Sequence, residues 1–350
     1  METVTVNASV PYPVHIGSGL LDEAGERIRA VTKSRRCALV TDSTVEPLYA
    51  GRVCASLERA GIAPLLYRFP AGEQSKNLTV YGKILEFLAE NRLTRSDFVI
   101  ALGGGVAGDM AGFAAATYQR GVDYIQMPTT FLAASDSSVG GKTAVDLAAG
   151  KNLVGAFHQP RLVLCDTDTF RTLPEETFAD GAAETVKHAL IADGDFYRFL
   201  MANDIRAHMD EVVRRNVEIK ASVVGEDEFE RGKRKLLNFG HTLGHAMEKI
   251  SAYTVTHGHA VAIGMALAAR ASERLGYSPA GTLDAVTAAC RRFGLPTQCP
   301  WDAGALYDAA TGDKKRDGGS IDIVVLEEIG RARTLRLDMD GLRRFVEAAL

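Results

Sequence analysis

Histidines gather in one short part of the chain. Four of the eight lie between His241 and His259, in the segments Asn238-Phe-Gly-His241-Thr-Leu-Gly-His245 and His257-Gly-His259. The i, i+4 spacing of His241 and His245 places both on one face of a helix. Glu184, on an earlier helical segment, could complete a site of imidazole and carboxylate ligands, the donor set of a catalytic zinc. Spacing alone leaves open which histidines bind.

Basic residues accompany these ligands along the chain. Lys187 shares a helix face with Glu184, and further cations follow at Lys220, Arg231, Lys233, Arg234 and Lys235. Such a series is normally a solvated face, but it could hold a phosphate or a carboxylate if the side chains turned inward. Composition does not decide between these two interpretations.

A glycine-rich turn follows an apolar run over residues 98–102. It reads Gly103-Gly-Gly-Val-Ala-Gly108-Asp109 and opens a helix of small residues, the context of a turn that binds the phosphates of a nucleotide. The alternative is a tight turn with close helix packing. No acidic residue closes a second strand about 20 residues later, as in the standard dinucleotide fingerprint. Asp42 could instead hold a ribose hydroxyl, or it could cap the next helix.

A second glycine-containing loop runs from Ser135 to Thr143. It ends in Gly-Lys-Thr but is not a phosphate loop, because Asp136 stands where the first glycine of that motif belongs. With Lys142, Lys151 and Asn152 nearby, the loop suits an anionic, polyhydroxylated ligand. A solvated basic loop is the alternative.

Two kinds of architecture must position these residues. Residues 37–118 alternate apolar runs (37–41, 64–69, 98–102) with helical patterns (45–60, 78–91, 106–118), and strands are also expected at 124–127 and 162–166. This order predicts a Rossmann-like, mostly parallel sheet that binds ligands beyond the carboxyl ends of its strands. From about Pro174 the patterns are mainly helical. We therefore expect an α/β domain over 1–175 and an α-helical domain over 176–350.

Composition excludes several classes of protein. The net charge of −4 does not fit an electrostatic nucleic-acid binder, and 46% hydrophobic residues suit a folded chain with ordinary cores. The longest apolar stretch, residues 260–269, is too short to span a bilayer, so no membrane partner is expected. Five cysteines without CxxC spacing fit a cytoplasmic protein, and Cys37 and Cys165 are expected to be buried.

Several longer motifs occur together in a fixed order, and they resemble those of the 3-dehydroquinate synthase family over essentially the whole chain. The motifs are Gly72-Glu73-Gln-Ser-Lys76, the glycine turn to Asp109, Tyr118-Gln-Arg120-Gly, Pro128-Thr-Thr130, Asp136-Ser-Ser-Val-Gly-Gly-Lys142, Gly150-Lys-Asn152, Glu184-Thr-Val-Lys187, the Asn238–His245 segment and Asp313-Lys-Lys315. The family commonly has Glu at the position of His259, and this departure is expected to alter the charge around the metal without removing a ligand.

The resemblance implies an NAD-binding domain, a metal-binding helical domain and an active site in the cleft between them. The implied ligands of zinc, or of cobalt, are Glu184, His241 and His257, which leaves His245 as a proton-transfer or substrate residue. The residues implied for NAD are Asp42, Glu73, Lys76, Gly104, Gly105, Val106, Gly108, Asp109, Thr129, Thr130, Lys142, Lys151 and Thr169, Phe170, Arg171, Thr172.

The resemblance further implies a carbon–oxygen lyase of the shikimate pathway, usually a homodimer, that makes 3-dehydroquinate from a sugar phosphate. The residues implied for the substrate are Asp136, Lys142, Lys151, Asn152, Lys187, Lys220, Arg234, Asn238, His245 and Lys314, with Arg120 supplied by the neighbouring subunit. Related cyclases that use other sugar phosphates, a metal-dependent polyol dehydrogenase and a non-catalytic NAD-binding protein are the competing readings. The cations implied for phosphate argue against the dehydrogenase, and the intact metal and substrate positions argue against the non-catalytic protein.

Overall fold

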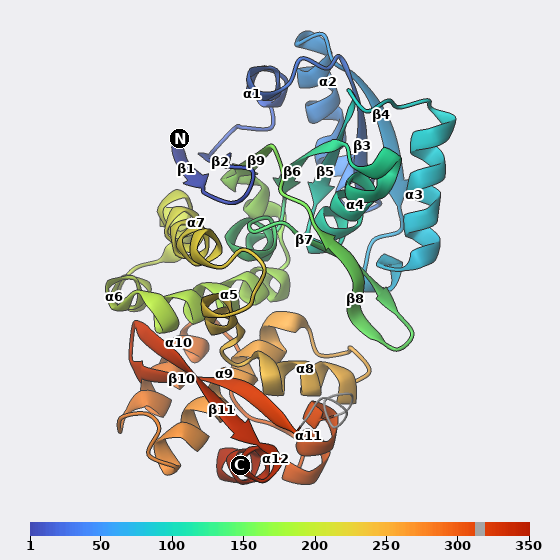
Figure 1. Cartoon of the computed structure of the whole chain (residues 1–350). Helices are drawn as coiled ribbons and strands as arrows, with labels where there is room; N and C mark the ends of the chain where they lie inside the picture. The colour runs from blue at the N-terminus through green and yellow to red at the C-terminus, as the bar shows by residue number, and fades with distance from the viewer. Residues whose placement is uncertain (312–318) are drawn as a thin grey trace. The chain divides into compact units, whose positions relative to one another are not determined.

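The computed structural model describes residues 1–311 and 319–350 (Figure 1). Its contacts divide the chain into two units. Unit 1 comprises residues 1–173 and 209–228, and unit 2 comprises residues 174–208 and 229–350. Within the described ranges, no helix has the length and apolarity needed to cross a membrane.

A seven-stranded sheet forms the centre of unit 1. The strand order is β1-β2-β9-β6-β5-β3-β4, and every neighbouring pair is parallel except β1 and β2. The sheet confirms the prediction of a mostly parallel architecture, whereas the antiparallel strand at its edge was not expected. The strands are β1 (Glu2–Val6), β2 (Tyr12–Gly17), β3 (Arg36–Asp42), β4 (Ala63–Phe69), β5 (Phe98–Gly103), β6 (Asp123–Pro128) and β9 (Leu162–Asp166).

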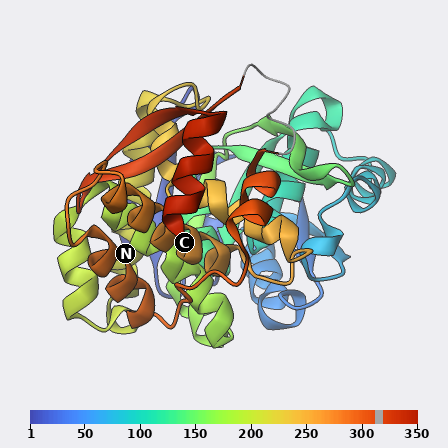
Figure 2. The ribbon, with the colours of Figure 1, turned by 90° about the horizontal axis from the view of Figure 1, so that it is seen from below.

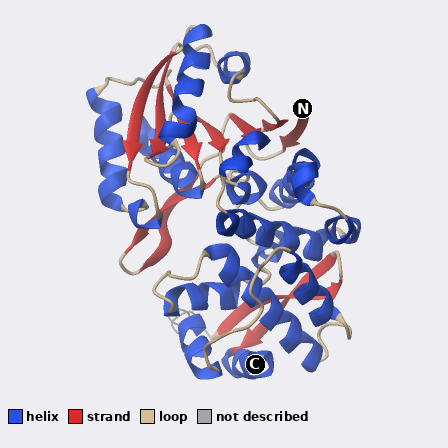
Figure 3. Ribbon diagram, turned by 180° about the vertical axis from the view of Figure 1, so that it is seen from behind, coloured by secondary structure: helices blue, strands red, loops and turns tan. Residues whose placement is uncertain are grey.

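Helices cover both faces of this sheet (Figure 3). On one face α1 (Ala24–Val31) and α2 (Gly51–Arg59) pack against side chains that include Cys37 and Leu39 of β3. On the other face α3 (Leu78–Glu90) and α4 (Gly105–Thr117) pack against Ala38 and Val40. Because successive strand residues point to opposite faces, one short apolar run supplies both cores. Cys37 and Cys165 are buried, as expected.

Two further elements complete unit 1. The helix α7 (Met209–Glu226) packs on β1 and β2. The expected loop after Gly141 is instead an antiparallel hairpin of β7 (Lys142–Leu147) and β8 (Gly150–Phe157). Its strands were not recognised from the sequence because Gly, Ala and charged residues separate the few β-branched residues, Thr143, Val145 and Val154. Small residues are required here, since a Cβ on Gly155 would lie 2.1 Å from the carbonyl oxygen of Thr143.

Unit 2 is mainly helical, as expected, but it also contains a hairpin. The apolar helix α9 is the most buried of its helices, and α12 packs against the hairpin of β10 (Ser320–Glu328) and β11 (Arg331–Asp338) (Figure 2). The helices are α5 (Glu175–Ala192), α6 (Gly194–Ala202), α8 (His241–Ile250), α9 (His257–Arg274), α10 (Thr282–Arg292), α11 (Ala303–Thr311) and α12 (Met339–Ala349).

Candidate active site

The residues expected to bind NAD lie largely along one edge of the sheet in unit 1. The parallel strands β3, β5, β6 and β9 end at this edge, where Asp42, the glycine turn, Thr129 and the Thr167–Thr172 turn follow them. The Thr129 N–H donates to the Gly103 carbonyl oxygen at 2.9 Å. A Cβ on Gly104 would lie 3.1 Å from Thr130 Cγ2. The turn and the threonines therefore form one continuous surface.

Close packing within the protein requires glycine at two positions of the turn. Gly103 has φ 155°, and a Cβ there would lie 2.8 Å from Ala107 Cβ and 3.5 Å from Asp42 Oδ2. A Cβ on Gly108 would lie 2.6 Å from Gln126 Oε1, so this glycine permits α4 to pack closely on β6. Val106, like Gly105, lies in the first turn of α4. The N–H groups of such a first turn suit a pyrophosphate.

Asp42 caps the turn that leads into the next helix and not the helix itself, whose capping residue is Val45 and has no side-chain cap bond. Its Oδ1 accepts from the N–H groups of Thr44 at 2.8 Å and Val45 at 3.0 Å. Its other oxygen, Oδ2, faces the turn at Gly103. Capping and contact with a ribose hydroxyl are therefore compatible, since each role uses a different oxygen.

In the turn after β9, most side chains implied for NAD are buried or bonded within the protein. Thr169 and Phe170 are buried, and the Thr169 hydroxyl donates to the Asp166 carbonyl oxygen at 2.7 Å. Arg171 is exposed and pairs with Asp168 at 3.0 Å. The Thr172 hydroxyl contacts Tyr49 and donates to the Thr169 carbonyl oxygen. These bonds hold the turn itself together.

Five of the residues implied for cofactor or substrate form one polar network in unit 1. Lys76 Nζ lies 2.6 Å from Asp109 Oδ2 and donates to Asn152 Oδ1 at 2.6 Å. Lys151 Nζ lies 3.3 Å from Glu73 Oε1. Burial would lower the pKa of Lys76, but the carboxylates of Asp109 and Glu73 outweigh it and raise that pKa. The network thus holds a buried, charged ammonium.

Other expected residues of unit 1 lie elsewhere. Lys220 Nζ is 2.8 Å from Asp136 Oδ1 and also donates to the Asp136 carbonyl oxygen. Lys142 and Lys151 lie toward opposite ends of the hairpin, because Lys142 is opposite Phe157. Arg120 is exposed, with φ 68° at the end of a short helical turn.

In unit 2, Glu184, His241 and His257 converge. Glu184 lies in the middle of α5, whereas the two histidines are the first residues of α8 and α9. Glu184 Oε1 is 3.2 Å from His257 Nε2 and 3.5 Å from His241 Nε2, and one ligand atom from each residue lies within 4.8 Å of the others. A carboxylate and two imidazoles in this arrangement could hold a zinc or cobalt ion.

Glycines permit the two histidine-bearing helices to approach. A Cβ on Gly264 of α9 would lie 2.0 Å from the carbonyl oxygen of Gly240, and one on Gly244 would lie 3.2 Å from that of Ala260. Gly240, with φ 79°, directly precedes α8. The contact between α8 and α9 therefore brings their first residues together, and a side chain at these positions would separate them.

The remaining nitrogen of each histidine also faces an acceptor. His241 Nδ1 lies 3.1 Å from the Phe239 carbonyl oxygen, and His257 Nδ1 lies 3.5 Å from Glu248 Oε2. Such partners fix which nitrogen faces a metal. Burial lowers the pKa of His241 well below its usual value, which favours the neutral ring that a ligand requires. Sequence reasoning missed Glu248, although its i+7 spacing from His241 placed it on the same helix face.

His245 lies on that face too, but it is mostly exposed, with 60% of its side chain accessible. It belongs with Glu248 and His257 to a second group of possible ligands, and its ring centre is 5.3 Å from that of His241. His241 and His245, the i, i+4 pair, are therefore neighbours. The group that contains the buried Glu184 nevertheless pairs His241 with His257 and not with His245.

Polar groups implied for the substrate lie in the same unit. Lys187 forms a buried ion pair with Glu184, and Arg234 is also buried. Asn238 Nδ2 donates to Glu230 Oε1 at 2.8 Å, a partner that sequence reasoning missed. Lys314 lies outside the described residues.

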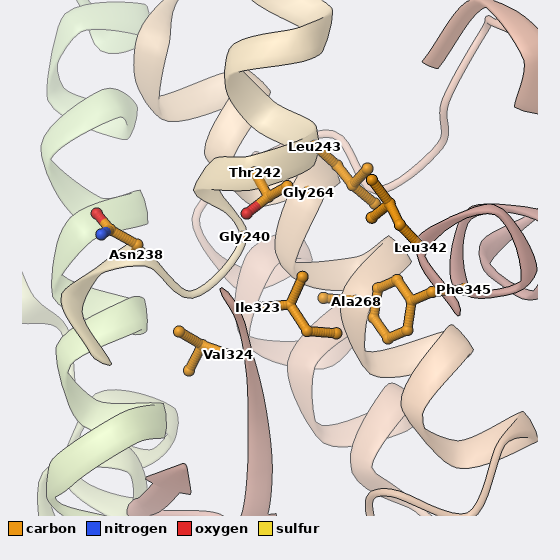
Figure 4. Close-up of a pocket in the computed structure, with 10 residues that line it drawn as sticks. All are labelled: Asn238, Gly240, Thr242, Leu243, Gly264, Ala268, Ile323, Val324, Leu342 and Phe345. Atoms are coloured by element: carbon orange, nitrogen blue, oxygen red, sulfur yellow. The ribbon is translucent and has the colours of Figure 1, made fainter. Parts of the chain in front are cut away.

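One hollow in unit 2 is mainly apolar and lies between α8, α9, β10 and α12. The apolar side chains of Ile323, Leu342 and Phe345 line it, together with Gly240 and the partly polar margin at Asn238 (Figure 4). A phosphorylated sugar would leave its polar groups unpaired on such a lining, so this hollow does not suit the substrate.

Comparison with known proteins identifies relatives over nearly the whole chain. Residues 66–180 match the family model for the 3-dehydroquinate synthase N-terminal region, and residues 181–316 match that for the C-terminal region. A 3-dehydroquinate synthase of Streptococcus suis is 43% identical over 352 residues, covering 98% of this chain and 99% of the relative. Another, from Caulobacter vibrioides, is 46% identical over 352 residues, covering 96% and 95%.

Solved structures share the fold at full length. A 2-deoxy-scyllo-inosose synthase in complex with carbaglucose-6-phosphate, NAD+ and Co2+ superposes with a TM-score of 0.89 at 26% identity, covering 100% of both chains. A 2-epi-5-epi-valiolone synthase from Streptomyces hygroscopicus with NAD+ and Zn2+ gives 0.86 at 29% identity, covering 97% of this chain and 95% of that chain. A probable glycerol dehydrogenase from Sinorhizobium meliloti, 15% identical with a TM-score of 0.68 over 99% of this chain and 97% of that chain, shares the fold.

Proposed function

The chain belongs to the 3-dehydroquinate synthase family, and we propose that it converts 3-deoxy-D-arabino-heptulosonate 7-phosphate to 3-dehydroquinate and phosphate, the second step of the shikimate pathway. The observation that carries the proposal is the donor set of Glu184, His241 and His257 in the same unit as two buried cations, Lys187 and Arg234. A metal site among cations suits a substrate that carries both hydroxyl and anionic groups.

The bonds of this substrate determine what the protein must accomplish. Phosphate leaves from C7 with the electron pair of the C7–O bond only if a proton leaves C6, and a ketone at C5 makes that proton acidic. The product is at the same oxidation level as the substrate, so the hydride removed from C5 must return there. When bound, NAD+ supplies the hydride acceptor and a divalent metal polarises the C5 oxygen.

Residues of this chain fit both groups. The neutral His241 ring and the Glu184 carboxylate are the ligand types that zinc and cobalt accept, with His257 as the third ligand. For NAD, the glycine turn offers backbone N–H groups to the pyrophosphate, and Asp42 Oδ2 is available to a ribose hydroxyl. The Lys76–Asp109 pair would line the rest of the cofactor site, together with Glu73 and Lys151.

The substrate's anionic groups require cations that are already held in place. We assign the phosphate and carboxylate to the buried cations Lys187, Lys220 and Arg234, with Asp136 orienting Lys220. The exposed Lys142 and Asn152, and Lys314, would complete the set. Buried, pre-oriented cations stabilise charge on the departing phosphate more than mobile surface ones do. Asn238, held by Glu230, would orient a hydroxyl, and the exposed His245 would move a proton during ring opening and aldol closure.

We also propose that two copies associate, and that Arg120 of one reaches the phosphate bound to the other. Arg120 is exposed at a left-handed turn that follows α4, which supports a role outside its own unit. Five reduced cysteines, three of them buried, support function in the cytoplasm.

The test compares substrates. Purified protein with NAD+ and Zn2+ is given the heptulosonate 7-phosphate, sedoheptulose 7-phosphate or glucose 6-phosphate, and the carbocyclic products are identified by mass spectrometry. Dehydroquinate from the first substrate alone supports the proposal. A cyclic product from either of the other two, with none from the first, would instead assign the chain to a related cyclase activity.

A further inference from the structure

Asp180 joins two helices of unit 2 through a single carboxylate oxygen. It lies on α5, four residues before Glu184 and therefore on the same helix face. Its Oδ1 accepts from the Thr256 hydroxyl at 2.7 Å and from the backbone N–H of His259 at 3.2 Å. The same oxygen lies 3.0 Å from His259 Nδ1, which must carry the proton because a carboxylate only accepts.

These bonds take the place of a local helix cap. Among the residues that the structure describes, the Thr256 side chain accepts no hydrogen bond from the first turn of α9, although Thr256 occupies the capping position. The free N–H groups of a first turn need an acceptor, and the Asp180 carboxylate provides one from another helix. A negative charge also favours this end of the helix dipole.

The backbones of α5 and α9 are in close contact at Asp180, which makes the junction between the two helices rigid. A Cβ on Gly258 would lie 2.3 Å from Asp180 Cα and 2.6 Å from its carbonyl oxygen. The first turn of α9 therefore rests directly on the backbone of α5. Since His257 is the first residue of α9, whatever fixes this turn also fixes the distance between His257 and Glu184.

We propose that Asp180 is a positioning residue for the metal site: its bonds to Thr256 and His259 hold His257 against Glu184 in the geometry that binds the ion. His259 is thereby a partner of Asp180, and it belongs to no group of possible metal ligands among the residues that the structure describes. The inference rests on the proposed metal site, and it assigns no contact with the metal to Asp180 itself.

The test measures metal binding by the full chain without substrate. Zn2+ affinity is determined by competition with a chelator, and the visible absorption of the Co2+-loaded protein reports its coordination geometry. In D180A we expect Zn2+ affinity to fall by about tenfold, the lower end of the loss caused by removing a direct partner of a metal ligand, with an altered Co2+ spectrum. D180N keeps an acceptor oxygen and should retain most of the affinity.

Two further variants separate positioning from general loss of structure. D193A removes an aspartate that caps α6 by accepting from the Phe196 N–H at 2.9 Å, so it matches D180A in kind. Asp193 directly follows α5, nine residues beyond Glu184, and belongs to no group of possible ligands among the described residues. D193A should lower the melting temperature and leave Zn2+ affinity unchanged. T256V removes the hydroxyl that donates to Asp180 and also lies 2.8 Å from His259 Nδ1, but it keeps both contacts between Asp180 and His259. It should therefore weaken Zn2+ binding by less than D180A, in a protein that remains folded.

The possible outcomes separate a failure of the positioning role from a failure of the proposed metal site. Wild-type protein that binds neither Zn2+ nor Co2+ would contradict the metal site itself. Wild-type binding together with equal affinity in D180A would contradict the positioning role alone. An equal loss of affinity in D180A and D193A would show that capping acts only through stability, and this also would overturn the inference.

Discussion

The Nε2 atom of His257 lies 3.2 Å from Oε1 of Glu184, so the first residue of α9 meets a carboxylate from the middle of α5. Glu184 is fully buried, and α8 adds His241 to the same group. Three helices therefore contribute one ligand each, and the loss of any one should leave an incomplete site. The group lies within unit 2, which allows it to be tested by metal binding alone.

Removing one ligand should abolish tight metal binding. For H257A and H241A we expect Zn2+ affinity to fall by at least about 100-fold, more than the loss of an outer partner causes. Chelator competition measures the change. H208A is the control, since His208 is exposed on the same unit and packs against Phe199. Zn2+ affinity in H257A equal to that of H208A would remove His257 from the site.

The Lys76–Asp109 pair should contribute strongly to the stability of unit 1. K76M leaves the carboxylate without its ammonium, so the free energy of unfolding in urea should fall by about 3–5 kcal/mol. The double variant K76M/D109L should recover most of this loss. Because the neighbouring carboxylates raise the pKa of Lys76, its charge persists until the pH rises through that raised pKa. In K76M the buried Asp109 carboxyl, whose pKa burial raises and Lys76 lowers, takes up a proton more readily, so the K76M penalty should be smaller at about pH 6 than at about pH 8. A loss below about 1 kcal/mol, the size expected of an exposed pair, would contradict the buried ion pair.

A substitution in the glycine turn should weaken cofactor binding without destabilising the fold. A Cβ on Gly105 would lie 3.3 Å from Ser137 Oγ, a contact that a small shift relieves, but it would occupy the surface offered to the pyrophosphate. We expect G105A to weaken NAD+ binding by about tenfold, or roughly 1.4 kcal/mol, with little change in stability. Calorimetric titration measures this. G82A is the matched control, because a Cβ on Gly82 of α3 meets nothing within 4 Å, and alanine should stabilise that helix by about 0.5–1 kcal/mol. Unchanged NAD+ affinity in G105A would place the pyrophosphate elsewhere.

A mixing experiment tests whether Arg120 acts across a dimer. R120A and H257A should each be inactive alone. If Arg120 serves the partner's site, a mixed dimer has one intact site, so an equal mixture that has exchanged subunits should recover about a quarter of wild-type activity. If Arg120 serves its own subunit, or if the protein is a monomer in light scattering, mixing will restore nothing.

The sequence predicted the sheet better than the hairpins. Runs such as Phe98–Leu102 are apolar throughout and buried on both faces, which is a strong strand signal. In contrast, β7 and β8 contain glycines, alanines and charged residues, and this segment was expected to be a loop. The hairpin matters for the site, because it places Asn152 on Lys76.

Site residues were predictable where the motif itself carries the chemistry. His241, His257 and Glu184 could be named from residue type and resemblance, and the structure brings them together. Glu248, which faces His257, and Asp180, which bonds Thr256 and His259, were not found, because each is a single acid whose importance depends on which helices meet. Packing between helices determines such contacts, and local sequence patterns do not encode it.

The central claim is that the hydride removed from the substrate returns to it. The most direct test supplies the heptulosonate 7-phosphate with deuterium at C5 and less than one equivalent of NAD+, then follows phosphate release, absorbance of NADH and deuterium in the product. We predict one phosphate and one dehydroquinate per substrate, no net NADH, and full retention of deuterium. NADH accumulating in step with substrate consumed, or deuterium lost from the carbocycle, would contradict the account.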